Sequence, residues 1–324
     1  MSGARHAEVM KEGGFTIVSG SGSRRRPAPP KRVAMHAAAA PSEPLRRDAA
    51  GRVAGLMSLG VRVDAAVDEL RASALARRLR AVLRGLAHPA CERPPVEAIV
   101  CLGLGSFGTA TAPRYQVALA LLLREELLGE ADGRAEGTGG DEAETPFCAF
   151  DPCFDELEIA FLRSRGCAVL TRNSEGRHSS PAPGGGSVLF FMPHCGRALY
   201  SNLVQHNWRP ASLASMLVLG NSFAALSGDP GAERAAAWSP LFRALPLASE
   251  SPIGVPAGSA ATSRGGGSGE PLFANAFNNT SLHAFDDDAL RALPEGWWER
   301  SFEPPPRDGE RLMSLDIVPA AAEA

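Results

Sequence analysis

The chain has 324 residues, and 44% of them are hydrophobic, so it can form one large domain or two small ones. Its 33 Lys and Arg against 36 Asp and Glu give a net charge of −3, which excludes a strong overall attraction to nucleic acid or to a membrane surface. The sequence has no uninterrupted apolar stretch of transmembrane length, and its six cysteines lack the CxxC spacing of zinc and redox sites. We therefore expect a soluble protein with buried thiols in a reducing compartment.

The first fifty residues differ from the rest of the chain in composition. They hold nine Lys and Arg but only four Asp and Glu, and they are rich in Ala, Pro, Ser and Gly. Such a segment buries too little apolar surface to fold, so residues 1–50 are predicted to be a disordered basic arm. Its cluster of Arg24, Arg25, Arg26, Lys31 and Arg32 is interpreted as a solvated tail or as a nuclear-import signal. The expected location is accordingly the cytoplasm, and also the nucleus where the cluster acts as an import signal.

Residues 56–86 place apolar side chains at spacings of three and four, which predicts an amphipathic helix with one break. Short apolar strands then alternate with helices. The predicted strands are 96–102, 148–150, 167–170, 187–192 and 215–219, and the predicted helices are 115–128, 155–165 and 196–206. Alternation of this kind is typical of a parallel sheet covered on both faces. We therefore predict an α/β fold, a Rossmann-like three-layer sandwich with a mostly parallel sheet, preceded by an amphipathic helical segment.

The predicted domain occupies residues 51–300. It contains two flexible insertions, near 130–145 and 228–270, because these segments include acidic or Gly- and Ser-rich stretches. Residues 301–324 are predicted to be a disordered tail.

Three glycines follow the first of these strands in a GxGxxG pattern. Gly103, Gly105 and Gly108 stand between a strand and a helix, where glycine lets the backbone approach a phosphate and the helix start offers free N–H groups. Ser106 lies in the same loop, and Asp151 ends the next strand, where an acid can bind a ribose hydroxyl. The loop is interpreted as a site for a nucleotide or an S-adenosylmethionine-type cofactor, or equally as a structural turn.

Polar side chains also follow the third, fourth and fifth predicted strands. They are Asn173, Glu175, His194, Tyr200, Asn202, Asn207, Asn221 and Ser222. Since parallel strands end at one edge of a sheet, these side chains and the glycine loop together form the candidate ligand site. Amides and hydroxyls also bind backbone groups in turns and caps, so a purely structural network is an equal alternative.

His194 and Cys195 are adjacent and follow the fourth predicted strand. Such a pair can ligate a metal ion or haem iron, and His178, His206 and His283 are possible further ligands, but no suitable ligand spacing is present locally. A buried, hydrogen-bonded histidine is the commoner outcome. No metal site is therefore predicted, and haem is kept as a candidate ligand.

Several spaced segments resemble one known family. They are CLGLGSFGTATAPRYQVALALLL (101–123), FDPCFDELEIAFLRSRG (150–166), NSEG (173–176), FFMPHCGRALYSNLVQHNW (190–208), GNSF (220–223) and FNNTSLH (277–283). In this order they are similar to the SRR-like family, named for sensitivity to red light reduced, from about residue 96 to residue 285. The resemblance implies a regulatory role, and it brings no established reaction or catalytic residues with it.

The resemblance implies links to the circadian clock and light signalling in plants, and to haem biosynthesis and clock gene expression in animals. We therefore expect a regulatory protein that influences haem biosynthesis and core clock gene expression through a small-molecule ligand or an unidentified protein partner. One alternative is an uncharacterised Rossmann-like enzyme that uses a nucleotide or an S-adenosylmethionine-type cofactor. The other is a haem or metal sensor. Neither membrane association nor direct nucleic-acid binding is expected.

Overall fold

The computed structural model describes residues 11–12, 15–16, 49–86, 93–129, 145–181, 184–227, 239–254, 273–299 and 302. The chain divides into two units, Met1–Arg47 and Asp48–Ala324. In the first unit, β1 (Lys11–Glu12) and β2 (Phe15–Thr16) pair antiparallel. Residues 49 and 50 of the predicted basic arm begin the first helix of the second unit, and the remainder of the arm, most of the predicted insertions and nearly all of the predicted tail lie outside the described residues.

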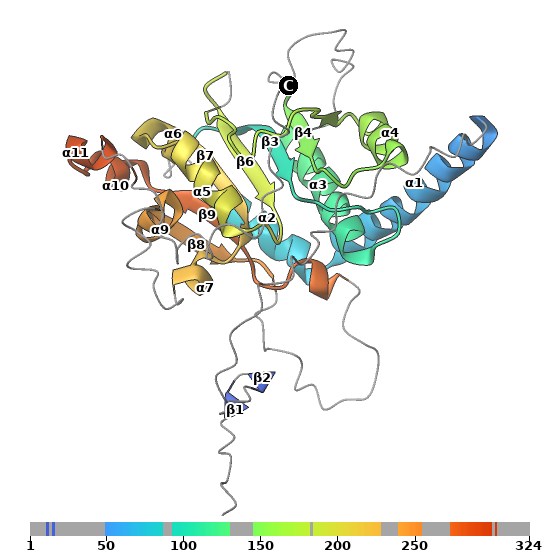
Figure 1. Ribbon diagram of the computed structural model, residues 1–324, viewed down its shortest axis with the longest axis horizontal. Helices are drawn as coiled ribbons and strands as arrows, with labels where there is room; N and C mark the ends of the chain where they lie inside the picture. The colour runs from blue at the N-terminus through green and yellow to red at the C-terminus, as the bar shows by residue number, and fades with distance from the viewer. Residues whose placement is uncertain are drawn as a thin grey trace, which may run out of the picture. The chain divides into compact units, whose positions relative to one another are not determined.

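A seven-strand sheet forms the centre of the second unit (Figure 1). Its strands are β3 (Val96–Leu102), β4 (Phe147–Phe150), β5 (Ala168–Val169), β6 (Ser187–Met192), β7 (Met216–Asn221), β8 (Ala248–Pro252) and β9 (Thr280–Phe285). They lie in the order β5-β4-β3-β6-β7-β9-β8, and every neighbouring pair from β5 to β7 is parallel. β9 runs antiparallel to both of its neighbours, β7 and β8. The prediction of a mostly parallel sheet is confirmed.

Helices precede, connect and follow these strands. They are α1 (Ala49–Ala72), α2 (Ala74–Leu86), α3 (Thr111–Leu128), α4 (Glu156–Ser164), α5 (Arg197–His206), α6 (Pro210–Ala214), α7 (Phe223–Ser227), α9 (Pro240–Ala244), α10 (Asp287–Arg291) and α11 (Glu295–Trp298), with short 3₁₀ turns η3 (Leu245–Leu247) and η4 (Ala274–Ala276). The helix predicted over 56–86 is α1 followed by α2. The break falls at Ser73, whose hydroxyl accepts the Ala76 N–H (3.1 Å) and so caps α2. Within the described residues, no helix is long and apolar enough to cross a membrane.

Two hydrophobic cores, one on each face of the sheet, explain why the strands are apolar on both sides. On one face, Cys101 of β3 and Phe191 of β6 belong to a core with α1, α2, α3 and α4. On the other face, their neighbours Leu102 and Phe190 belong to a core with α5, α6, α7, α9 and α10. Figure 1 shows helices on both sides of the sheet. The predicted three-layer sandwich is confirmed.

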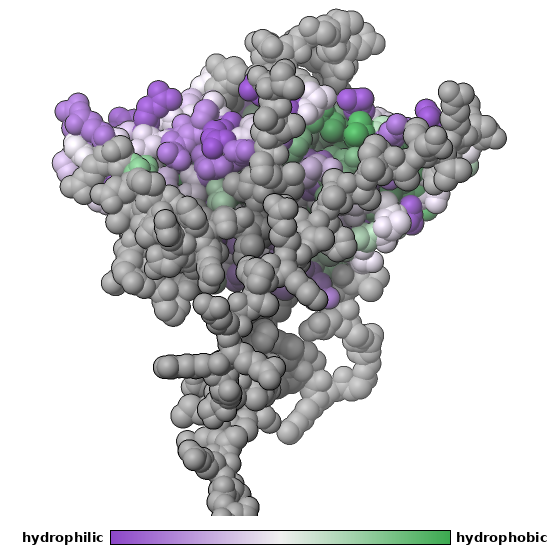
Figure 2. All heavy atoms as spheres, viewed as in Figure 1, coloured by the Kyte–Doolittle hydropathy of each residue, from purple (hydrophilic) through white to green (hydrophobic). Residues whose placement is uncertain are grey.

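The outer helix surfaces differ in polarity. Gln205 and His206 of α5 are exposed, and Figure 2 shows hydrophilic residues gathered over α5 and α6. The first half of α1 is different, because Val53, Met57 and Val61 leave 58%, 68% and 71% of their surface exposed. These three side chains are spaced by four residues, so they form one apolar stripe along the helix.

The sequence does not predict β8 or β9. Residues 239–254, inside the predicted insertion 228–270, form α9, η3 and β8. The β8 segment, Ala-Ser-Glu-Ser-Pro, lacks the β-branched and aromatic residues that mark strands. It is a strand because its backbone pairs with β9, from Ala248 opposite Phe285 to Pro252 opposite Ser281. Tertiary pairing therefore decides the structure here, and local propensity does not.

Candidate functional site

The carboxyl ends of the parallel strands form one edge of the sheet, which we call the strand-end edge. Gly103 follows β3, Asp151 follows β4, His194 lies just beyond β6, and Asn221 ends β7. Since these strands are parallel and adjacent in the sheet, the loops that follow them meet at this edge. Because β9 is reversed and pairs Thr280 with Asn221, the chain that enters β9 also reaches this edge.

The glycine loop, residues 103–108, has a backbone that requires glycine. Gly103 and Gly105 have φ angles of +68° and +71°, a region that favours glycine. A Cβ atom on Gly103 would lie 2.6 Å from the sulfur of Cys195. The Cys195 thiol also donates to the carbonyl oxygen of Leu102 (3.3 Å). The loop after β3 is thus packed tightly against the loop after β6.

Two carboxylates of the chain itself occupy amides of the glycine loop. The Gly105 N–H donates to Asp151 Oδ2 (2.7 Å), and the Gly108 N–H donates to Glu158 Oε1 (2.6 Å). The Ser106 hydroxyl donates to the same Glu158 oxygen (2.8 Å). A phosphate bound to these two amides would have to displace both carboxylates. The geometry therefore does not favour phosphate binding at Gly105 and Gly108.

Glu158 is fully buried and comes from the first turn of α4. Its Oε2 accepts the Asp155 N–H (2.9 Å), while Asp155 accepts the Glu158 N–H (2.8 Å), which makes a capping box at the start of α4. No ion pair in the described part of the chain involves Glu158. Its carboxylate is held instead by donors from Gly108, Ser106 and Asp155, so α4 is fastened to the glycine loop.

Tyr200 and Asn221 fasten the loop between β6 and α5. The buried Tyr200 hydroxyl donates to the carbonyl of Met192 and accepts the Asn221 N–H (2.9 Å). The Asn221 side chain accepts the His194 N–H (3.0 Å) and donates to the carbonyl of Cys195 (2.9 Å). Burial raises the pKa of Tyr200 well above its ordinary value, so its hydroxyl stays protonated.

His194 and Cys195 direct their candidate ligand atoms into the protein. His194 Nε2 lies 3.0 Å from the carbonyl oxygen of Ala276, and since a carbonyl only accepts, this nitrogen carries the proton. Cys195 is 9% exposed, with its sulfur against Gly103 and Leu102. Ligation of a metal ion or haem iron by this pair does not fit that arrangement.

The three further histidines considered as ligands are also engaged. His178 Nε2 lies 2.6 Å from the Ser174 hydroxyl, His206 Nε2 lies 3.1 Å from the Ser179 hydroxyl, and His283 Nε2 donates to the carbonyl of Asn221 (3.0 Å). Across the described ranges, no group of three or more His, Cys, Asp or Glu side chains is placed to hold a metal ion.

The loop after β5 is supported by amide side chains. The Glu175 N–H donates to Asn173 Oδ1 (2.9 Å), and Asn202 Nδ2 of α5 donates to the carbonyl of Glu175 (2.9 Å). Asn207 Oδ1, at the end of α5, accepts the Ser180 N–H (2.7 Å). These contacts correspond to the structural-network alternative, because each amide satisfies backbone groups. A ligand-binding role for these residues stays a prediction.

The far side of the edge contains a buried histidine. His283 of β9 is fully buried and stacks on the ring of Phe223, with a centroid distance of 3.7 Å. Burial lowers the pKa of His283 to about 4, although the carboxylate of Glu250 acts in the opposite direction. Ser222, beside Asn221, accepts an N–H from α7 (3.2 Å). His283 is therefore neutral near pH 7 and acts as a packing and hydrogen-bonding group.

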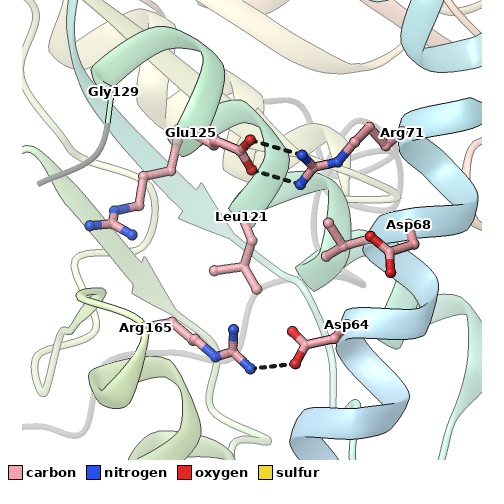
Figure 3. A pocket seen from close by; sticks show the side chains of 9 residues that line it. Asp64, Asp68, Arg71, Leu121, Glu125, Gly129 and Arg165 are labelled. Carbon is pink, nitrogen blue, oxygen red and sulfur yellow. Dashed lines mark hydrogen bonds and ion pairs between the residues drawn. The ribbon is translucent and has the colours of Figure 1, made fainter.

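Two cavities are lined by none of the predicted site residues. The first, the charged pocket, has a volume of about 330 Å³ and lies among α1, α3 and the end of α4 (Figure 3). Arg71 of α1 donates twice to Glu125 of α3 (3.0 and 2.8 Å), and Arg165 pairs with Asp64 (2.8 Å). These ion pairs brace the three helices against one another.

The second cavity, the α1–α2 pocket, has a volume of about 350 Å³ and is mainly apolar. It lies between the corner joining α1 to α2 and the chain that leaves β8 and enters η4. Its lining consists of Glu69, Ala72, Ser73, Ala74, Leu75, Arg78, Ile253, Phe273, Ala274 and Phe277.

Sequence reasoning misses both Glu158 and the α1–α2 pocket. The only sequence signal for Glu158 is the Asp155-x-x-Glu158 capping-box spacing, which predicts a helix start and says nothing of the glycine loop. The pocket has no signal, since small side chains such as Ala72 and Ala74 form it.

The fold and its strand-end edge define a Rossmann-like α/β protein, a class that binds ligands at the carboxyl ends of its strands. A family model, the SRR1 domain, matches residues 69–284, which is more than half of the chain. The chain therefore belongs to the SRR1 domain family, and the sequence resemblance is confirmed. No solved structure matches it significantly.

Three curated relatives are similar to this chain. An SRR1-like protein of Mus musculus is 37% identical over 128 residues, covering 39% of this chain and 45% of the mouse protein. Protein SENSITIVITY TO RED LIGHT REDUCED 1 of Arabidopsis thaliana is 38% identical over 125 residues, 39% of each chain. An SRR1-like protein of Drosophila melanogaster is 26% identical over 210 residues, 64% of this chain and 62% of the fly protein. The matches thus span less than two thirds of each relative.

Proposed function

We propose that this protein is a regulatory member of the SRR1 family that influences haem biosynthesis and circadian clock gene expression. It acts through a small molecule or a protein partner bound at the strand-end edge. The observation that carries the proposal is the SRR1 domain match over residues 69–284. The Arabidopsis relative, named for reduced sensitivity to red light, supports a signalling role.

The proposal is tested by removing the protein from the cells that make it and then supplying the unchanged chain again. Loss of the protein is expected to change both cellular haem content and the rhythm of clock transcripts, and the unchanged chain is expected to restore them. Unaltered haem and transcripts after loss would reject the assigned processes.

A matched pair of variants tests the location of the site. Asp151→Asn changes an acid at the strand-end edge, while Glu156→Gln makes the same change on an α4 side chain that is 80% exposed. At equal protein levels and equal melting temperatures, Glu156→Gln is expected to restore function and Asp151→Asn to fail. Full restoration of function by the Asp151→Asn protein would mean that the functional site does not lie at the strand-end edge.

A second candidate function, an enzyme with an S-adenosylmethionine-type cofactor, is supported by the strand order. Counting from β3, the sheet runs 3-2-1-4-5-7-6 with the seventh strand reversed. Class I methyltransferases arrange their sheets in the same way, which is an analogy at the level of the fold. In that arrangement a glycine loop after the first strand and an acid after the second bind the cofactor, positions held here by residues 103–108 and Asp151.

The sequence leaves two cofactor classes open, nucleotides and S-adenosylmethionine-type cofactors. The carboxylates bonded to the glycine loop favour the second class. S-adenosylmethionine has no phosphate, so it can bind near the loop without displacing Asp151 or Glu158. A pyrophosphate-bearing dinucleotide would compete with both carboxylates for the loop amides. Asp151 can still accept from a ribose hydroxyl, because each carboxylate oxygen has a second lone pair.

Calorimetric titration and thermal unfolding with S-adenosylmethionine, S-adenosylhomocysteine, NAD⁺ and ATP test this candidate. The two phosphate-free ligands are expected to bind saturably and, at 100 times the dissociation constant, to add about 2.7 kcal/mol of stability. Asp151→Asn is expected to weaken them at least tenfold. Binding of NAD⁺ or ATP alone, or of none of the four, would reject the candidate.

A further inference from the structure

We infer that the α1–α2 pocket binds a small zwitterion with an apolar side group, of the chemical class of the hydrophobic amino acids. Its volume of about 350 Å³ falls within the range of small-molecule sites. Seven of its ten lining residues are apolar, which is also usual for such sites. The inference concerns residues outside the strand-end edge and does not rest on the proposed function.

The apolar part of the pocket fits a hydrocarbon or aromatic side group. Leu75, Ile253 and Phe277 are buried and line it, and Phe273 is partly buried beside them. Ala274 leaves the space that a larger side chain would fill. An apolar group that enters here loses its contact with water and gains contact with these side chains.

Two opposite charges line the same pocket and are not paired with each other. Glu69 of α1 accepts the Tyr115 hydroxyl through Oε2, and its Oε1 has no hydrogen-bond partner among the described residues. Arg78 of α2 donates through Nη1 to the carbonyls of Ile253 (3.0 Å) and Gly254 (3.2 Å). Its Nη2 and Nε donate to no acceptor in the described part of the chain. Both side chains are exposed, and each can form at least one further hydrogen bond.

The pair of charges selects for a ligand of zero net charge. An ammonium group is attracted by Glu69 and repelled by Arg78, and a carboxylate meets the reverse. A zwitterion carries both groups, so it offers the opposite charge to each of these exposed side chains, with its apolar group in the remainder of the cavity. This combination is the basis for choosing the amino-acid class over an amine or a carboxylic acid.

The walls of the pocket are held in place by bonds outside it. The carbonyl of Ala276 accepts from His194 Nε2 (3.0 Å) and from Gln116 Nε2 (3.4 Å), which fixes η4. The rings of Phe273 and Tyr115 meet edge to face, with centroids 5.8 Å apart. A fixed pocket binds without first ordering its walls, which favours affinity for small ligands.

Calorimetric titration of the full chain with three probes tests the assignment. The probes are L-phenylalanine, phenethylamine and 3-phenylpropionate, which share one ring and differ in charge. L-Phenylalanine is expected to bind saturably and at least ten times more tightly than the other two. Absence of saturable binding, or tighter binding of either singly charged probe, would overturn the inference.

Three variants, one of them a control, test whether the ligand binds in this pocket. Ala74→Leu fills part of the cavity and is expected to weaken L-phenylalanine at least tenfold, while Ala65→Leu, an exposed change on α1 outside the pocket, leaves binding unaltered. Glu69→Gln removes the negative charge and is expected to narrow the preference for L-phenylalanine over 3-phenylpropionate. Equal binding by the Ala74→Leu and Ala65→Leu proteins, with both folded, would place the ligand elsewhere and overturn the assignment.

Discussion

The strand-end edge and the α1–α2 pocket differ in how polar groups and open space are distributed. At the edge, Asp151, Glu158, Tyr200 and Asn221 have their polar atoms bonded to neighbouring backbone. The pocket contains few polar groups, and Glu69 is one whose second oxygen lacks a described partner. Polar residues at strand ends therefore hold the loops in place, whereas the open volume of the α1–α2 pocket lies where small and apolar side chains meet.

The largest expected change in stability follows removal of the buried carboxylate of Glu158 at the strand-end edge. Glu158→Ala leaves donors from Gly108, Ser106 and Asp155 without their acceptor, so we expect a loss of about 3–5 kcal/mol in the free energy of unfolding. Urea denaturation measures it. Glu156→Ala, on the exposed side of the same helix, serves as the control and should stay within about 0.5 kcal/mol of the parent. Similar losses in both variants would mean that the network does not hold the edge.

The next effect concerns pH. His283 has a pKa of about 4 in the folded protein, against an ordinary value of 6.5, so the unfolded chain binds more protons between these values. Stability from this group is complete above pH 6.5 and is lost as pH falls towards 4, to a total of about 3 kcal/mol. The histidine ring signals in NMR should show a midpoint near 4 for His283. A midpoint near 6.5 would place the ring in water and outside the edge network.

The chain has two tyrosines, one at the strand-end edge and one beside the α1–α2 pocket, so replacing each by phenylalanine compares the stability cost in the two regions. Tyr200→Phe removes the bonds to the Asn221 N–H and the Met192 carbonyl in the core, and we expect a loss of about 1–3 kcal/mol in unfolding free energy. Tyr115→Phe removes one bond to the exposed Glu69 beside the pocket and should cost less than about 1 kcal/mol. Thermal and urea unfolding of both proteins give the difference. The reverse order would contradict the contrast between the hydrogen-bonded strand-end edge and the open α1–α2 pocket.

The smallest effect lies at the charged pocket. Arg71 and Glu125 form a two-bond ion pair, but their side chains are 45% and 47% exposed. A double-mutant cycle to alanine should give a coupling energy of about 0–1 kcal/mol, weakened further by added salt. A coupling that is both larger and insensitive to salt would show that this pair is shielded from water.

The sequence predicts the inner strands well because their residues are buried on both faces. The 96–102 and 187–192 predictions match β3 and β6 to the residue, since their apolar runs, 99–102 and 188–192, are buried between two helical layers. β8 lies at one end of the sheet and is paired through its backbone, so its sequence has no apolar run that would predict a strand. β9 contains a recognisable motif, but its period does not reveal a strand inserted antiparallel between β7 and β8.

The sequence predicts where the residues of the candidate site lie, but it does not predict which hydrogen bonds they form. Parallel topology alone brings Gly103, Asp151, His194 and Asn221 to one edge. Which N–H each carboxylate accepts depends on packing between helices far apart in the chain, such as Glu158 of α4 against Gly108. Sequence spacing carries no information on such contacts, and none on where Ala72 and Ala274 leave a cavity.

The reversed β9 has a consequence for truncation and for the order of folding. Among the described strands, β8 pairs with β9 alone, whereas β9 pairs with both β7 and β8. A chain that stops before Thr280 therefore keeps the five parallel strands but has nothing to hold β8. During synthesis from the N-terminus, residues 248–252 must wait for residues 280–285 before they can join the sheet. The parallel half of the sheet can thus assemble first, and β9 then joins β8 to it.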